Sequence, residues 1–112
     1  MPKPYDRYAG LVAKMLLEPG ITFGADGVSP RRAFGADALK VGGRIFAMQG
    51  RGRLVVKLPR GRVDALVAAG DGERFDPGHG RLMREWFALD LGSDQDWDAL
   101  ANEALIYVGR RR

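Results

Sequence analysis

The chain has 112 residues, 46% of them hydrophobic, and a formal net charge of +4. This length is typical of one domain, and the apolar content excludes an intrinsically disordered chain. Because it has no cysteine, no apolar run of about 20 residues and no signal-peptide pattern, we expect a single cytoplasmic domain over residues 1–112, without disulfides or a membrane partner.

The first predicted element is an amphipathic helix. Apolar residues recur along it at helical spacing: Tyr8, Leu11, Val12, Met15 and Leu16. The sequence "EPG" at 18–20 ends this helix. The glycine- and proline-rich stretch 21–37 predicts a mostly irregular connection with at most one short strand.

A three-stranded antiparallel meander is predicted from Ala38 onward. The segments "ALKV", "RIFAM" and "RLVVKL" alternate in polarity, and the short turns "GG" and "QGRG" separate them. Strict alternation predicts one aliphatic face, which would pack under helices. The opposite face would carry Lys40, Arg44, Phe46, Met48, Arg53, Val55 and Lys57.

The remainder predicts a short helix at 60–70, a short strand at "GERF", a strand at "REWFALDL" and a last helix that begins at Ser93 as N-cap. We expect Trp86 and Trp97 to be core residues. The predicted order is α-β-β-β-α-β-β-α. We therefore expect an α+β fold of two layers, with about five antiparallel strands and the helices packed on one face.

His79, the only histidine, lies in "RFDPGHGRLMREW" between two glycines. A metal site or a catalytic triad needs further ligands or a nucleophile that this loop lacks. Asp76, Pro77 and Gly78 favour a turn instead. We therefore expect a protein that is not an enzyme and that binds neither a metal nor a cofactor.

The charge is unevenly distributed. Residues 30–62 carry nine basic side chains and one acid, whereas residues 85–103 carry six acids and no base. A basic meander with an aromatic side chain predicts binding to DNA or another nucleic acid. The predicted interface consists of Arg44, Phe46, Arg51, Arg53, Lys57, Arg60 and Arg62, and Arg31, Arg32 and the terminal arginines would reinforce it.

Two alternatives stay open for this face. Long cationic side chains often cover apolar atoms on a solvated sheet without any partner. Phe46 and Met48 could instead bind another protein or a second copy of the chain, with no nucleic acid involved.

The segments "ADALKVGGRIFAM", "RLVVKLP", "GERFDPGHGRLMREW" and "ALANEALIYV" resemble the MmcQ/YjbR-like and TfoX N-terminal-like group of small bacterial proteins. The resemblance covers roughly residues 23–108. It implies a two-layer α+β fold and a role in DNA binding or transcriptional regulation. It brings no set of catalytic residues. The TfoX regulators usually carry a second, C-terminal domain, which we do not expect here.

Overall fold

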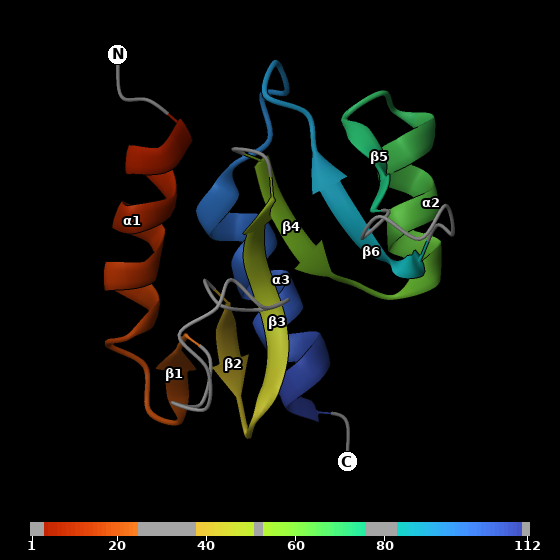
Figure 1. Cartoon of the computed structure of the whole chain (residues 1–112). Coiled ribbons are helices and arrows are strands. Elements are labelled where there is room, and N and C mark those ends of the chain that lie inside the picture. The colour runs from red at the N-terminus through yellow and green to blue at the C-terminus, as the bar shows by residue number, and fades with distance from the viewer. Residues whose placement is uncertain (1–3, 25–37, 51–52, 76–82, 111–112) are drawn as a thin grey trace.

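The computed structural model describes residues 4–24, 38–50, 53–75 and 83–110, and the structural statements below concern these residues (Figure 1). They form three helices, α1 (Pro4–Met15), α2 (Arg60–Ala68) and α3 (Trp97–Arg110). They also form six strands, β1 (Ile21–Phe23), β2 (Leu39–Val41), β3 (Arg44–Gly50), β4 (Arg53–Lys57), β5 (Gly72–Phe75) and β6 (Met83–Leu89).

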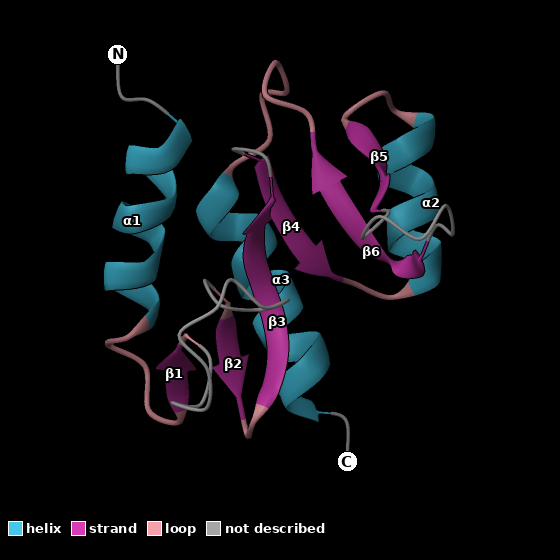
Figure 2. Cartoon of the chain, in the orientation of Figure 1, coloured by secondary structure: helices cyan, strands magenta, loops and turns pink. Residues whose placement is uncertain are grey.

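The strands form one antiparallel sheet in the order β1-β2-β3-β4-β6-β5 (Figure 2). The predicted α+β class is confirmed, and so is the meander, which runs from β2 to β4. The sheet has one strand more than the predicted five. The additional strand, β1, lies in the stretch that was expected to be mostly irregular.

The turn between β2 and β3 forms as its glycines predict. Gly42 and Gly43 have φ values of +59° and +79°. Positive φ at both central positions defines the tight hairpin turn whose twist matches that of the flanking strands. This turn fixes where β3 begins.

A β-bulge follows within β3. Leu39 pairs with Ala47, but Lys40 pairs with Ile45, so Phe46 is an extra residue opposite β2. A bulge inserts one residue into the strict alternation of a strand, and both neighbours can then face the same side. Phe46 and Ala47 both belong to the core under the helices.

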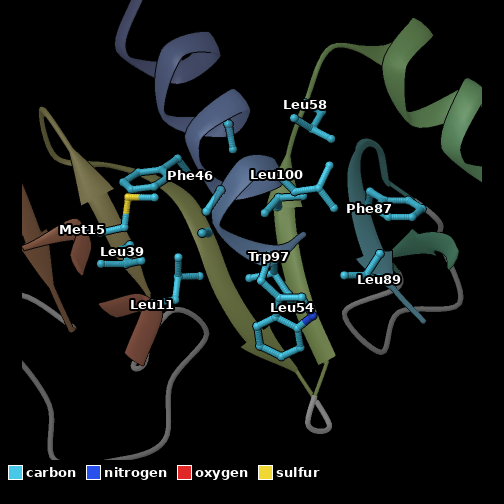
Figure 3. Packing of buried hydrophobic residues seen from close by; sticks show 14 of the residues in the cluster. Leu11, Met15, Leu39, Phe46, Leu54, Leu58, Phe87, Leu89, Trp97 and Leu100 are labelled. Carbon is cyan, nitrogen blue, oxygen red and sulfur yellow. The ribbon is translucent and has the colours of Figure 1, made fainter. Parts of the chain in front are cut away.

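All three helices contribute to one core on one face of the sheet, shown in part in Figure 3. It includes Leu11 of α1, Leu66 of α2 and Trp97 and Leu100 of α3. A smaller buried cluster lies on the opposite face. Its buried members are Ala38, Met48, Val55, Trp86 and Ala88. Both tryptophans are buried, as predicted, but they lie on opposite faces of the sheet.

The helix ends follow local capping rules. The amide of Asp71 donates to the carbonyl of Leu66, and that of Gly70, with φ +80°, donates to Val67. This pair of bonds ends α2 at the predicted glycine.

The predicted start of the last helix was wrong: α3 begins at Trp97, and the Asp96 carboxylate accepts from the amide of Asp98. Ser93 instead donates to Asp71, 3.0 Å away, and accepts from the amide of Gln95.

α1 is held against α3 at two points beside its buried residues. The Lys14 ammonium lies 2.6 Å from the Asp98 carboxylate, and this bond raises the pKa of Lys14. The Arg7 guanidinium stacks over the Trp97 ring, 4.5 Å from its centroid.

Candidate functional site

The predicted alternation holds along β4. Leu54 and Val56 belong to the helix-side core, whereas Val55 belongs to the cluster on the opposite, outer face. Arg53 and Lys57 share the face of Val55 because they lie two residues away from it. Arg53 and Lys57 therefore lie on the face of the sheet that the alternation predicted for them.

Arg53 and Lys57 each contact another side chain. Arg53 donates to the Glu73 carboxylate on β5, 2.9 Å away. The Lys57 ammonium lies over the Trp86 ring, 5.7 Å from its centroid. Both side chains are half-buried. The nearby acid offsets the charge of Arg53, so this end of β4 is a weaker site for phosphate than its sequence suggested.

The predicted position of Phe46 was wrong. Its side chain is 0% exposed and belongs to the helix-side core (Figure 3). The bulge shifts the phase of β3 at Phe46, so an alternation counted back from Ala47 assigns Phe46 to the wrong face. A fully buried ring cannot stack on a base.

The predicted face of Arg44 was wrong for a related reason. Arg44 pairs directly with Val41, which packs against the helix-side core. Directly paired residues in antiparallel strands share a face. Arg44 therefore lies on the opposite face of the sheet from Arg53 and Lys57.

The large apolar side chains that the structure describes on the outer face are buried. Met48 is 4% exposed, Val55 0% and Trp86 7%. The alternative of a protein or homodimer interface through Phe46 and Met48 needed both side chains at the surface. Because both side chains are buried, Phe46 and Met48 do not form an exposed patch.

Basic residues instead lie on three neighbouring segments: the connection from β4 to α2, the start of β6 and the end of α3. The amide of Leu58 donates to the carbonyl of Glu85, so the start of β6 lies beside this connection. The Tyr107 hydroxyl donates to the Glu85 carboxylate, 3.1 Å away, which ties α3 to the same place. We name this surface the basic end and define it as Lys57, Arg60, Arg62, Arg84 and Arg110.

The cations of the basic end lie on both sides of the sheet. Lys57 lies on the outer face, where its ammonium contacts the ring of Trp86. Arg62 and Arg110 lie on the helix side with α2 and α3. A polyanion that passed this end could contact cations from both faces.

Only one of these arginines is held by an acid within the described residues. The Arg62 guanidinium makes two bonds to the Glu103 carboxylate, at 2.9 and 3.1 Å. Those bonds raise the pKa of Arg62. Arg60, Arg84 and Arg110 are exposed and have no acidic partner in that part of the chain. Their charges remain available to a ligand.

A groove of about 510 Å³ opens between α2 and α3 beside these charges. This volume lies in the range of small-ligand sites. Its wall combines apolar and cationic side chains. The lining residues are Pro59, Arg62, Glu103, Ile106, Tyr107 and Arg110.

Some predicted residues lie outside the described residues. These are Arg31, Arg32, Arg51, His79, Arg111 and Arg112, together with the predicted turn at 76–78. Within the described ranges, no group of three or more histidine or acidic side chains could hold a metal ion. No helix in those ranges is long and apolar enough to cross a membrane.

Sequence reasoning missed Arg84, Tyr107 and the groove. In the sequence, Arg84 lies at the start of a predicted strand, about 25 residues after Lys57 and Arg60. Tyr107 lies in a predicted helix, about 50 residues after them. Only the β4–β6 pairing and the packing of α3 bring them together. The arginine tail was a partial signal, because Arg110 is its first member.

Comparison with known proteins gave no match to a family model, to a curated protein or to a solved structure.

Proposed function

We propose that this chain is a non-enzymatic, cytoplasmic module that associates with nucleic acid by docking its basic end on phosphates. The observation that carries the proposal is the convergence of five cations at the basic end, four of them without an acidic partner in the described chain. Arginine without an internal partner can bind phosphate through two parallel hydrogen bonds. The resemblance to the MmcQ/YjbR-like and TfoX N-terminal-like group supports the same role.

The docking surface in this proposal differs from the one that the sequence predicted. Lys57, Arg60 and Arg62 belong to both, and Arg110 was expected as part of the reinforcing arginine tail. Arg84 is added, and Arg44, Arg53 and Phe46 are left out. The reason is electrostatic: Arg53 is neutralised by Glu73, and Arg84 is not neutralised by any described acid. Phosphates would meet less local repulsion at the basic end.

The test is fluorescence anisotropy of a labelled oligonucleotide titrated with wild-type protein, Arg84→Gln and Arg53→Gln. Both variants lower the net charge by one, and both residues lie on strands of the sheet. We expect Arg84→Gln to weaken binding by about threefold to tenfold and to reduce the salt slope, since one phosphate contact is lost. Arg53→Gln should change affinity by less than about twofold.

Two results would contradict the proposal. Equal weakening by the two variants would mean that the whole sheet face, rather than the basic end, contacts the nucleic acid. If no oligonucleotide binds at physiological salt, the basic end does not serve to bind nucleic acid. Sedimentation of the protein alone would then show whether a second copy is the partner.

A further inference from the structure

We propose that the groove between α2 and α3 receives one unpaired base, so that the chain prefers single-stranded to double-stranded nucleic acid. This inference rests on the proposed function, because it assigns a place to the base while the basic end holds the backbone. It also replaces the stacking platform that the sequence had assigned to Phe46.

The composition of the groove fits a nucleotide. Pro59, Ile106 and Tyr107 offer flat or apolar surface, and Ile106 is 45% exposed although it is a large aliphatic residue. Arg110 stands at the same wall, with no acid bound to it in the described chain. A nucleotide combines an aromatic, weakly polar face with an adjacent anion, and this is the complement of such a wall.

The charge balance of the groove favours an anion. Arg62 and Arg110 carry two positive charges, and Glu103 carries the one negative charge among its lining residues. Because Glu103 is fully engaged by Arg62, the charge of Arg110 is the one left over. A single phosphate next to the inserted base would compensate it.

The geometry of the ligand gives the preference for single strands. Bases in a duplex are stacked and paired, so they enter a protein groove only if they are first unstacked. A single strand presents unpaired bases without that cost. Arg60 and Arg84, which flank the β4–α2 connection, would hold the neighbouring phosphates.

The experiment compares three labelled probes of equal length: oligothymidine, the corresponding abasic oligomer and a duplex. The abasic oligomer keeps the phosphates and removes the bases. Wild-type protein should bind oligothymidine about 5- to 100-fold more tightly than the abasic oligomer, the range expected for stacking one base. The duplex should bind more weakly than oligothymidine.

Matched variants assign that difference to the groove. Ile106→Asn should reduce the preference for oligothymidine over the abasic oligomer by at least about threefold. Leu91→Asn should leave it unchanged, since Leu91 is a similarly exposed apolar residue (51%) outside the groove. Tyr107→Phe keeps the ring and should retain the preference, whereas Tyr107→Leu should lose it.

The outcomes separate the two proposals. Equal, salt-dependent binding of all three probes would overturn the groove inference and leave the basic end as the docking surface. Absence of binding to every probe would overturn both. A preference for oligothymidine that survives Ile106→Asn and Tyr107→Leu would place the base elsewhere and also refute the groove.

Discussion

At the scale of single residues, Phe46 shows how one inserted residue reverses an assignment. It lies opposite β2 as the extra residue of a bulge, and its ring is fully buried in the helix-side core. The same side chain on the outer face would be a surface aromatic. Its contribution to stability therefore distinguishes the two arrangements.

We predict that Phe46→Ala lowers the free energy of unfolding by about 3–5 kcal/mol, because a buried ring is lost and a cavity is left. The measurement is a urea denaturation midpoint at constant m-value. Phe23→Ala is the matched control, since Phe23 is 44% exposed on β1, and it should cost less than about 1 kcal/mol. Similar small losses for both variants would mean that Phe46 lies at the surface.

At the scale of elements, β5 and β6 pack so closely that one position admits only glycine. A Cβ atom added at Gly72 would lie 2.2 Å from the carbonyl oxygen of Ala88 and 2.7 Å from the Phe87 ring. Gly72 pairs with Leu89, so a shift of β5 would disturb the adjacent ladder. The close approach also holds the loop before α3, through the bond from the amide of Asp90 to the carbonyl of Asp71.

We predict that Gly72→Ala destabilises the fold by about 1–3 kcal/mol, the usual cost of overpacking. Gly10→Ala is the control on α1, where an added Cβ would meet nothing within 4 Å. That change should stabilise the helix by about 0.5–1 kcal/mol. Thermal unfolding of both variants beside wild type measures the contrast, and a neutral Gly72→Ala would show that the strands can separate.

At the scale of the whole molecule, the charges are separated along α3. Asp94 and Asp96 precede its first turn, and Arg110 is its last residue. A helix of 14 residues is about 20 Å long, roughly two and a half Debye lengths at physiological ionic strength. The position of a charge should therefore matter more for binding than the net charge does.

We predict that Asp94→Asn, which raises the net charge by one at the far end from Arg110, changes oligonucleotide affinity by less than about twofold at physiological salt. At low salt the same variant should bind measurably more tightly, since screening is weaker. Titrations at the two salt concentrations test this. A clear gain at physiological salt would show that net charge alone drives the association.

Local patterns were sufficient for most elements of the fold. The apolar stripe of α1, the Gly42–Gly43 turn, the alternation along β4 and the glycine stop of α2 are properties of short segments, because spacing and backbone freedom act over a few residues. The same local rules also supported the burial of Trp97. They could not locate the bulge, since a bulge is a property of two paired strands.

The α+β class, the meander and the excess of basic residues in the first half of the chain follow from the amino-acid sequence alone. The tertiary structure decided which of those residues form a surface. Arg53 and Arg62 gained acidic partners from distant segments, Phe46 entered the core, and Arg84 and Tyr107 joined residues about 25 to 50 positions away. Ion pairs, strand register and the α2–α3 groove all depend on contacts between segments far apart in the chain, and no local spacing encodes those contacts.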